Sequence, residues 1–508
     1  MSPLHAPHID YAGLSPLLAL AGGICVTLLL GLARGPGTRT IVTTAALLTL
    51  GAATTLAAWQ LGENKTLVAG ALRADDLAFS LDFVFFAAAA FALILSLREP
   101  DRRIGNLGDY SSLLLTSVMG MAVLAGSTNL ITLFLGIELL SIPLYVLCAI
   151  DVGRRTSLEA GLKYLVIGSV GSATLLYGLA LVYGASGSTD FGRIAASISS
   201  TGVLGDPLLL TGIALAATGL AFKASVAPFH QWTPDVYQGA PTPVTSFMAV
   251  ATKAAAFAII LRFFDDALHP AKGDWDVALA ALAVASIAIG NIGAIGQDSL
   301  KRMLAYSGVA QAGYMLAGVV VGSSIGLKSV VFYLLVYLLM NVAAFAVVIA
   351  RERETPLGDD IESVAGIGAS RPALAWPLTI SMIALAGLPG TAGFIGKFFL
   401  IEASVKGDFT WLGIVIVVGS MVSLGYYLRV VAAVWMRPAP EQPRVRPGVA
   451  PVIAGGSPEA DAKPAARFGP TVEAEAIAIL AAAAVIVFGI VPSPLLDLAS
   501  DAARAIFG

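Results

Sequence analysis

The sequence predicts an all-α protein that crosses a membrane about fourteen times. Of its 508 residues, 57% are hydrophobic and only 12% are charged, and the mean hydropathy is +0.84. Soluble globular proteins carry about twice that share of charged residues. Long apolar stretches also recur along the whole chain, and each is long enough to cross the roughly 30 Å hydrocarbon core, for which a helix needs about 20 residues.

The predicted spans run from the N-terminus almost to the C-terminus. No Lys or Arg precedes the first of them and no clear small-residue cleavage site follows it, so we expect a span rather than a cleaved signal. The stretches are 15–33, 41–59, 77–97, 110–126, 129–150, 158–184, 207–229, 243–265, 276–296, 303–322, 329–350, 373–403, 409–436 and 471–492.

The basic residues predict the orientation of these spans. Of the thirty lysines and arginines, seventeen fall in loops that follow odd-numbered spans, seven fall on the other side with the termini included, and six lie inside spans. Short loops rich in Lys and Arg stay in the cytoplasm. We therefore expect both termini on the non-cytoplasmic side.

Two of the spans contain helix-breaking residues. The seventh is predicted to end at Pro228, beside Lys223, and the twelfth carries AGLPGTAGFIGK, which ends at Lys397. Proline removes a backbone donor and interrupts a helix, although proline kinks are also common in purely structural membrane helices. Two breaks that lie five helices apart predict an inverted repeat of helices four to eight and nine to thirteen. A lysine beside each break favours an ion path.

This organisation predicts five regions. They are helices one to three in 1–109, the first repeat in 110–265, the inverted second repeat in 266–436, a flexible cytoplasmic linker in 437–470 and a C-terminal helix in 471–508. The linker is rich in Pro, Ala and Gly, as expected of a segment that does not pack.

The composition argues against several kinds of site. Cys25 and Cys148 lie far apart in apolar stretches, where we expect them to be small buried side chains rather than a redox or iron-sulfur pair. The four histidines form no pair typical of haem or metal ligation, and His230 lies in the loop after the seventh span. The net charge of −3 comes without the basic patch that nucleic-acid binding requires.

Charged residues inside spans are the candidate functional groups. Glu138 is the only carboxylate deep in the fifth span, and we expect it to face the protein interior, either in an ion pair that pins two helices or as a proton carrier. Lys163 is close enough to a helix end for its stem to snorkel to the interface. Lys223, Lys253 and Lys397 lie nearer helix centres, where snorkelling is harder.

The remaining polar groups in the spans suggest a proton-conducting path. Arg262 and Arg429 lie near helix ends, where we expect interfacial anchors. Desolvation lowers a lysine pKa and a nearby carboxylate raises it, so a carboxylate that approaches and leaves a lysine makes it bind and release a proton. No redox group is needed for this chemistry. Further polar residues in helices nine to eleven could carry a water wire between the breaks; they are Gln297, Tyr306, Gln311, Tyr314 and Asn341.

Five separated motifs carry a resemblance to a known family. They are GIELLSIPLYVL with Glu138, GLKYLVIGS with Lys163, the stretch 222–253 with Lys223 and Lys253, QDSLKRMLAYSGVAQAGYM, and LAGLPGTAGFIGKFFLIEA with Lys397. Over roughly residues 75–435 the chain resembles the subunit N family of bacterial NADH-quinone oxidoreductases, which are part of respiratory complex I. The wider family includes subunits L and M and the Mrp-type cation/proton antiporters.

The resemblance implies roles for individual residues. Glu138 and Lys223 would form the coupling pair of a first half-channel, Lys253 the central relay, and Lys397 the link to the opposite exit, with Lys163 as a modulator. His230, Gln311 and Tyr314 would support this path. One departure concerns Gln311, since many relatives have a histidine there, and glutamine orients water but does not titrate.

The resemblance also implies the setting of the chain. We expect a proton-translocating, non-redox subunit in the bacterial inner membrane, in contact with lipids and with M-, L-, K-, J-, A- and H-like subunits. NADH, FMN, iron-sulfur clusters and quinone would bind to partner subunits. The alternative from another class is an Mrp-type cation/proton antiporter subunit driven by ion gradients. A purely structural scaffold would leave the buried acids and bases unexplained.

Overall fold

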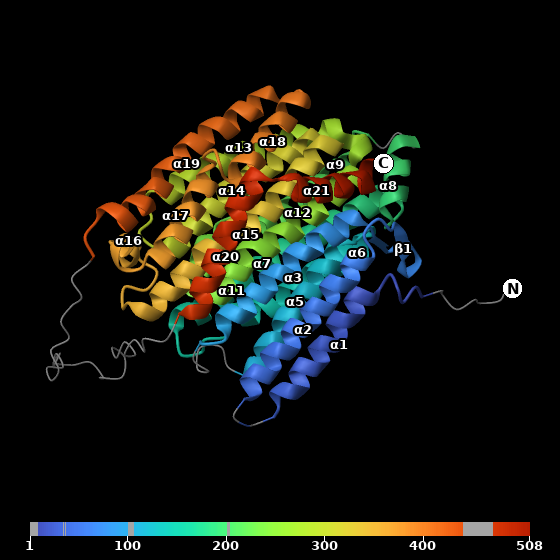
Figure 1. Cartoon of the computed structure of the whole chain (residues 1–508). Coiled ribbons are helices and arrows are strands. Elements are labelled where there is room, and N and C mark those ends of the chain that lie inside the picture. The colour runs from blue at the N-terminus through green and yellow to red at the C-terminus, as the bar shows by residue number, and fades with distance from the viewer. Residues whose placement is uncertain (1–8, 34, 36, 100–105, 201–203, 440–470) are drawn as a thin grey trace, which may run out of the picture.

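A computed structural model describes residues 9–33, 35, 37–99, 106–200, 204–439 and 471–508. Almost all of these residues are helical, and the helices lie side by side in one bundle (Figure 1). The helices are α1 Ser15–Gly31, α2 Thr38–Trp59, α3 Asp76–Ser96, α5 Leu107–Ala125, α6 Leu130–Cys148, α7 Arg155–Ser186, α8 Phe191–Ser200, α9 Pro207–Ala224, α10 Trp232–Gly239, α11 Thr242–Phe247, α12 Lys253–Arg262, α13 Lys272–Ile295, α14 Leu300–Val321, α15 Ser324–Glu354, α16 Ile367–Ser370, α17 Pro372–Ala386, α18 Ala392–Lys406, α19 Thr410–Met436, α20 Val472–Ile490 and α21 Ser493–Phe507.

The prediction of an all-α membrane protein is confirmed. Among the described residues, twelve helices are long and apolar enough to cross a membrane, and α1 and α17 are apolar but shorter. Each predicted stretch coincides with a helix or, for the twelfth, with the pair α17 and α18. The number of crossings and the five predicted regions stay predictions, and the linker lies outside the described residues from 440 onward.

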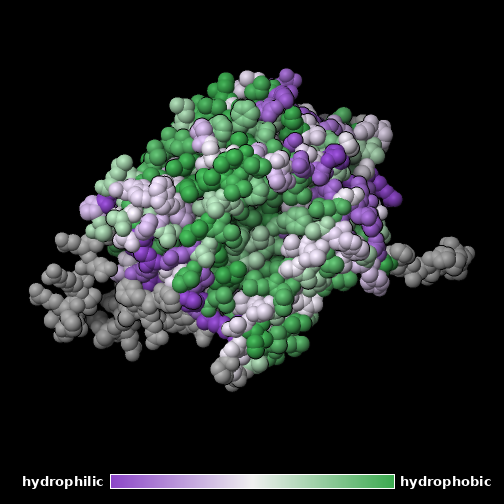
Figure 2. Space-filling model, in the orientation of Figure 1, coloured by the Kyte–Doolittle hydropathy of each residue, from purple (hydrophilic) through white to green (hydrophobic). Residues whose placement is uncertain are grey.

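The surface has the distribution of side chains that a membrane protein needs. Figure 2 shows a broad hydrophobic band across the visible face, with hydrophilic side chains gathered at its two margins. The only strands in the described part of the chain, β1 Lys65–Leu67 and β2 Leu72–Ala74, form an antiparallel hairpin at one of these margins (Figure 1). We call this margin the hairpin face.

The most buried helices lie in the middle of the bundle. The helical segment from Thr242 to Ala267 is buried along its whole apolar length, and α14 and α15 are almost as buried, whereas only a third of α2, α7 and α19 is buried. A helix that is apolar on all sides and buried on all sides requires other helices around it. Polar groups in the middle of α14 and α15 and at the start of α12 are therefore shielded from both lipid and bulk water.

A matching pair of backbone hydrogen bonds, which we call a bridge, occurs in each half of the chain. In the first, Leu130 N donates to Thr189 O at 2.8 Å and Phe191 N donates to Thr128 O at 3.0 Å. In the second, Leu300 N donates to Asp359 O and Ile361 N donates to Asp298 O, both at 2.7 Å. Every residue of the second bridge follows its counterpart by the same sequence interval. This match supports the predicted repeat, which otherwise stays a prediction.

Three details of the sequence analysis were wrong. The seventh span ends at Ala224, before Pro228, because Ser225 adopts a left-handed conformation that stops the helix. Arg262 is no interfacial anchor, since it is completely buried and paired with Asp75. Cys25 is exposed, whereas Cys148 is buried as expected.

Candidate functional site

The first helix break is a capped helix end inside the bundle. Ser225 has φ +60° and ψ +37°, and Val226 N reaches back to Ala221 O at 2.8 Å. This pattern satisfies part of the free carbonyls at a helix C-terminus. A loop then leads to α10, and a second turn leads to α11. The break therefore leaves polar backbone beside the lysine at position 223.

Lys223 lies in the last turn of α9 and is 2% exposed. Its Nζ donates to Ser141 Oγ at 2.7 Å and to Tyr164 OH at 3.3 Å, and it lies 5.3 Å from the centre of the Tyr164 ring. Within the described residues it forms no ion pair with a carboxylate. The ammonium group is thus held by neutral hydroxyl groups.

Glu138 lies one turn before Ser141 on α6, so the two side chains share a helix face. It is partly buried, and its Oε1 is buried without a hydrogen-bond partner. Its charge acts on the Lys223 ammonium, although the two groups are not within ion-pair distance. Glu138 and Lys223 thus lie close enough to interact electrostatically, but they form no ion pair.

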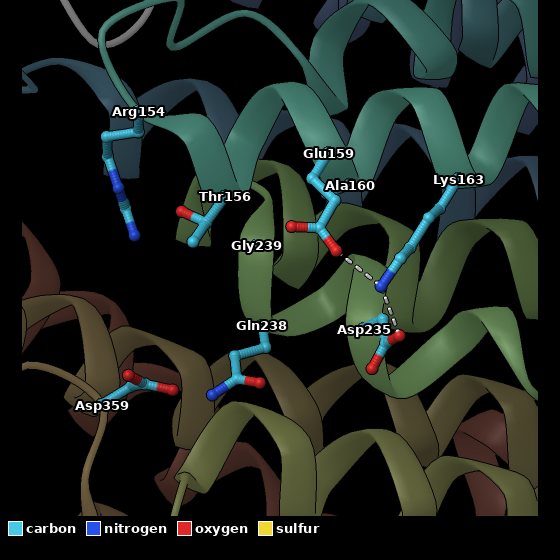
Figure 3. A pocket seen from close by; sticks show the side chains of 9 residues that line it. All are labelled: Arg154, Thr156, Glu159, Ala160, Lys163, Asp235, Gln238, Gly239 and Asp359. Carbon is cyan, nitrogen blue, oxygen red and sulfur yellow. Dashed lines mark hydrogen bonds and ion pairs between the residues drawn. The ribbon is translucent and has the colours of Figure 1, made fainter.

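Lys163 lies away from these buried groups, in the wall of a pocket of about 300 Å³ (Figure 3). Its side chain is 39% exposed and forms ion pairs with Glu159 at 2.7 Å and with Asp235 at 2.8 Å. The next residue, Tyr164, contacts Lys223 instead. Successive residues of a helix point in different directions, and it is Tyr164 that faces the interior.

Asp235 joins this pocket to α14. It accepts a hydrogen bond from Arg302 Nη1 at 2.6 Å in addition to the bond from Lys163. Burial opposes ionisation of Asp235, but the bonds from Lys163 and Arg302 outweigh it and lower the pKa of this carboxyl. Asp235 belongs to α10, which directly follows the first break, so α10 links the pocket to that break.

Lys253 is completely buried at the start of α12. The preceding turn, η2 (Met248–Thr252), is a wide π-helical turn, a feature frequent at functional sites. The Lys253 Nζ donates to Ala224 O at 3.3 Å, which is a free carbonyl at the first break. On its other side is Gly308, where an added Cβ would lie 3.0 Å from Lys253 Cε and 3.2 Å from Tyr337 OH. Glycine therefore leaves the space between this lysine and this tyrosine open.

His230 lies in the loop of the first break and is 8% exposed. Burial, followed by the charge of Lys253, lowers the pKa of His230. Its Nδ1 has no hydrogen-bond partner, and its ring packs edge-on against Tyr306 at 6.2 Å. The imidazole therefore binds a proton less readily than an exposed histidine, and it sits within the electrostatic reach of Lys253.

The second break has the same type of cap as the first. Gly387 has φ +84°, and Leu388 N reaches back to Ile383 O at 3.1 Å, after which α18 begins at Ala392. Lys397 lies on α18, is 3% exposed, and donates from Nζ to Leu385 O at 2.8 Å and to Ala386 O at 3.1 Å. A cation at the C-terminal end of a helix is stabilised by the helix dipole.

Gln311 connects α14 to the second break. Its Nε2 donates to Leu385 O and to Tyr427 OH, both at 3.2 Å, and its Oε1 accepts from Tyr333 OH at 2.5 Å. Both amide protons and the carbonyl are used. Leu385 O is the same carbonyl that binds Lys397, so one acceptor links the glutamine to the lysine.

Tyr314 completes the surroundings of Lys397. The Lys397 Nζ lies 4.8 Å from the centre of its ring, within the range of a cation-π contact. The Tyr314 hydroxyl accepts from Asn291 Nδ2 at 3.2 Å. The structure thus brings Tyr314 into contact with Lys397, and its supporting role stays a prediction.

Sequence reasoning missed the neutral partners of the buried lysines. Ser141 and Tyr164 bind Lys223 and lie inside two of the quoted motifs, where the charged residues are more conspicuous than the hydroxyl groups. Tyr337, near Gly308, and Tyr427, which binds Gln311, lie in ordinary apolar stretches. Ser141 could have been found from its spacing, because it follows Glu138 by one helical turn. Among the described residues, no group of three or more His, Cys, Asp and Glu side chains could hold a metal ion.

Comparisons with known proteins agree with this architecture. Residues 127–423 match the profile of the family described as "NADH:quinone oxidoreductase/Mrp antiporter, TM". The NADH-quinone oxidoreductase subunit N of Trichlorobacter lovleyi is 39% identical over 432 residues, which cover 85% of this chain and 84% of that protein.

Two solved structures share the fold. A chain of respiratory complex I from Thermus thermophilus with bound aureothin is 32% identical, with a TM-score of 0.77 over 96% of this chain and 99% of that chain. A chain of the Mrp complex from Dietzia sp. DQ12-45-1b has a TM-score of 0.79 over 98% and 97% of the two chains, but at 23% identity this likeness shows the fold alone. On the strength of the family profile and the curated relatives, the chain belongs to the subunit N family of bacterial NADH-quinone oxidoreductases.

Proposed function

We propose that this chain moves protons across the membrane as a non-redox subunit of a proton-pumping NADH-quinone oxidoreductase. Glu138, Lys223, Lys253 and Lys397 form the relay in this proposal. The names of its relatives support the setting, since they are subunits N of that enzyme. The geometry of the buried lysines supports the chemistry.

The observation that carries the proposal is a set of three buried lysines without a carboxylate partner. Lys223, Lys253 and Lys397 are at most 3% exposed, and in the described part of the chain none of them forms an ion pair. An unpaired ammonium group is costly to bury, which favours a neutral amine in its place. Neutral hydroxyl and carbonyl acceptors stabilise the charged form only in part. Each lysine is thus suited to hold a proton transiently.

The first transfer runs between Lys223 and Lys253. The Lys253 Nζ donates to the carbonyl of Ala224, which is the residue after Lys223. Lys223 binds a proton more tightly while Glu138 is close. When Glu138 withdraws, the favourable charge is lost and Lys223 releases the proton more readily. Lys253 is a buried base that contacts the same break. A bridging water would connect the two amines, since polar backbone lines the space between them.

The second transfer runs from Lys253 to Lys397 through α14. Gly308 leaves space between Lys253 and Tyr337, and Gln311 one turn later is bonded to Tyr333, Tyr427 and the carbonyl that binds Lys397. Gln311 does not titrate, so its role is to orient hydroxyl groups and water along the path. The protonatable groups are the lysines at the two ends.

Lys163 acts in this proposal as a modulator from the pocket. Its ion pair with Asp235 holds α10, which follows the first break directly. A change in this pair alters the position of the break and thereby the surroundings of Lys223. Lys163 itself is 39% exposed and paired with carboxylates, so it is not part of the buried relay in this proposal.

The setting of the chain is part of the same proposal. We expect the bacterial inner membrane, with M-, L-, K-, J-, A- and H-like subunits as partners and with FMN, iron-sulfur clusters and quinone bound by partner subunits. Both termini would be non-cytoplasmic, because the loops on the other side carry most of the basic residues. A reporter fused after Gly508 should then report the non-cytoplasmic side, and one inserted at position 455 the cytoplasm.

The proposal is tested at Lys253, the central lysine. Lys253→Arg keeps a positive charge but does not release a proton, because arginine stays charged in proteins. We expect assembled complex with pumping close to that of Lys253→Ala, while the exposed Lys406→Arg serves as the control and pumps normally. Normal pumping by Lys253→Arg would remove this lysine from the path. Purification without flavin and iron-sulfur subunits would favour the antiporter alternative.

A further inference from the structure

A second set of buried charges lies at the end of α12, near the hairpin face, outside the proposed relay. Arg262 is completely buried, and its guanidinium contacts Asp75 Oδ1 and Ala125 O, with Asp266 Oδ2 at 3.8 Å from Nη1. Asp82, on the same helix as Asp76, interacts electrostatically with both Asp75 and Arg262. We call Asp75, Asp82, Asp266 and Arg262 the acidic cluster.

The acidic cluster has more carboxyl groups than a structural ion pair needs. Asp75 caps α3 by accepting from Ala78 N at 3.0 Å and also binds Arg262, which accounts for its Oδ1. Its Oδ2 has no hydrogen-bond partner, and neither have Asp82 Oδ1 and Asp266 Oδ2, although all of these atoms are buried. One guanidinium does not neutralise three carboxylates, and unpaired buried carboxylates are costly as anions. The cluster therefore has room to hold protons.

A pocket lies next to the cluster and meets it at Asp75. It has a volume of about 520 Å³, and the buried Asp75 is part of its wall. Its other walls come from the turn after α2, the start of α3 and the last helix, α21; they are Leu61, Gly62, Glu63, Asn64, Asp76, Asp501, Arg504 and Ala505. The turn from 61 to 64 and the end of α21 both belong to the predicted non-cytoplasmic side. We call this pocket the vestibule.

The cluster also extends inward toward the level of Lys253. Asp82 follows Asp75 by seven residues, about 10 Å along α3, and Lys253 precedes Arg262 by nine residues, about 13 Å along α12. The two helices run in opposite directions and pack against each other, and α3 also packs against η2, the turn that directly precedes Lys253. Asp82 and Lys253 thus lie at similar depths, with Asp75 between Asp82 and the vestibule.

We propose that the acidic cluster is a proton-holding site that exchanges protons with non-cytoplasmic water through the vestibule, and that it gives protons from the level of Lys253 an exit in addition to the one expected beyond Lys397. This inference rests on the proposed relay. The ligand is a proton: a carboxylate oxygen of Asp82 takes it up, Asp75 passes it on, and water in the vestibule accepts it. No electron moves and no bond between heavy atoms changes.

The charges around the cluster set its proton affinity. The residues that face it or adjoin it are Arg73 from β2, Asp265 from the π-helical turn η3 (Phe263–Ala267), Lys272 from α13, Asp76 from α3, Glu63 from the turn after α2, and Asp501 and Arg504 from α21. Acidic groups outnumber basic ones in this set. They favour retention of a proton until the vestibule water removes it.

The test compares Asp82→Asn with Asp274→Asn in the intact membrane complex. Both changes remove one carboxylate near the hairpin face, but Asp274 is exposed at the start of α13. We expect Asp82→Asn to assemble and to pump more slowly by about tenfold, because a positioned proton-transfer group contributes at least this much. Asp82→Glu should restore part of the rate, and Asp274→Asn should pump normally. Normal pumping by assembled Asp82→Asn would overturn the inference.

A second measurement separates this inference from the relay and from a folding defect. Dicyclohexylcarbodiimide adds to protonated carboxyl groups, so mass spectrometry of the wild-type complex should find an adduct on Asp82 that forms faster at lower pH. Absence of the adduct from folded complex would contradict proton holding even if Asp82→Asn does not assemble. If Lys253→Arg abolishes pumping while Asp82→Asn pumps normally, the relay stands and the cluster is only structural. If both variants pump normally, both proposals fall.

Discussion

The two helix breaks share one backbone solution but use their lysines differently. Each first half-helix ends in a left-handed residue, Ser225 or Gly387, with the next amide reaching back to the fifth preceding residue. At the second break Lys397 binds the freed carbonyls, and at the first break Lys253 does so. The first break has a second buried lysine, Lys223, which is bound to hydroxyl groups near Glu138.

This difference indicates different roles for the lysines at the two breaks. A lysine on the carbonyls of a capped helix end is held by fixed dipoles, which do not change during a cycle. A lysine beside a movable carboxylate experiences a field that changes when the carboxylate moves. We infer that the first break receives the coupling signal, whereas the second break passes the proton on. The substitutions below are chosen to test that division.

The largest effect is expected at Glu138. Glu138→Gln keeps the shape and removes the charge that acts on Lys223, so the complex should assemble while proton pumping and coupled quinone reduction fall by about tenfold or more. Glu138→Asp should retain part of the activity. Pumping is measured in reconstituted vesicles, with assembly checked on a native gel. A Gln variant that pumps normally would show that the first break receives no signal through this carboxylate.

Substitutions at the two caps should differ in their effect on stability. At Gly387 an added Cβ would lie 2.8 Å from Lys397 Cδ and would force a side chain into φ +84°, so Gly387→Ala should cost about 1 to 2 kcal/mol and also displace Lys397. Ser225→Gly removes a side chain from the same left-handed conformation, so stability should change by less than about 1 kcal/mol. The dissociation temperature of the purified complex reports both effects. Equal destabilisation by Gly387→Ala and Ser225→Gly would contradict the view that both residues cap their helices in the same left-handed conformation.

A smaller effect is expected at Gln311, between the breaks. Gln311→Leu leaves Tyr333 OH, Tyr427 OH and Leu385 O without their partner and should slow pumping several-fold, since each lost bond to a buried group costs about 1 to 3 kcal/mol. Gln311→His keeps a donor and an acceptor and should be tolerated. The comparison is made on pumping rates at equal complex content. Equal rates for wild type and the Leu variant would place the path elsewhere.

The smallest effect is expected at Asp235, in the pocket beside the first break. Its lowered pKa means that its ion pairs with Lys163 and Arg302 stabilise the fold fully above about pH 4 and are lost as the pH falls through the lowered value. Asp235→Asn should therefore reduce stability at pH 7 by less than about 1 kcal/mol, because the pairs are partly exposed. The difference from wild type should shrink below pH 4. A difference that grows toward acidic pH would contradict this sign.

Much of the fold could be predicted because the bilayer imposes strong rules on sequence. The length of the apolar stretches predicts the spans, and Pro and Gly beside Lys223 and Lys397 predict both breaks. The exact end of α9 could not be predicted, because the stop is a left-handed serine rather than the proline that follows it. Arg262 was misassigned because its partner, Asp75, is distant in sequence and only the folded chain brings the two together.

The candidate site was predictable in its charges but not in its contacts. A carboxylate or lysine inside a span is conspicuous, so Glu138, Lys223, Lys253 and Lys397 could be selected directly. Their partners are hydroxyl groups and backbone carbonyls, which every sequence contains in abundance. The π-helical turn before Lys253 has no signature among alanine and valine, and the outward direction of Lys163 follows from packing rather than pattern.

The central claim is that buried lysines carry protons rather than hold helices together, and Lys223 tests it most directly. Lys223→Arg can still donate to Ser141 and keeps the positive charge near Glu138, but it does not release a proton at any pH the complex survives. The measurement is the number of protons pumped per NADH oxidised in vesicles that contain assembled complex. The account predicts that Lys223→Arg pumps almost as poorly as Lys223→Ala, and full pumping by Lys223→Arg would contradict it.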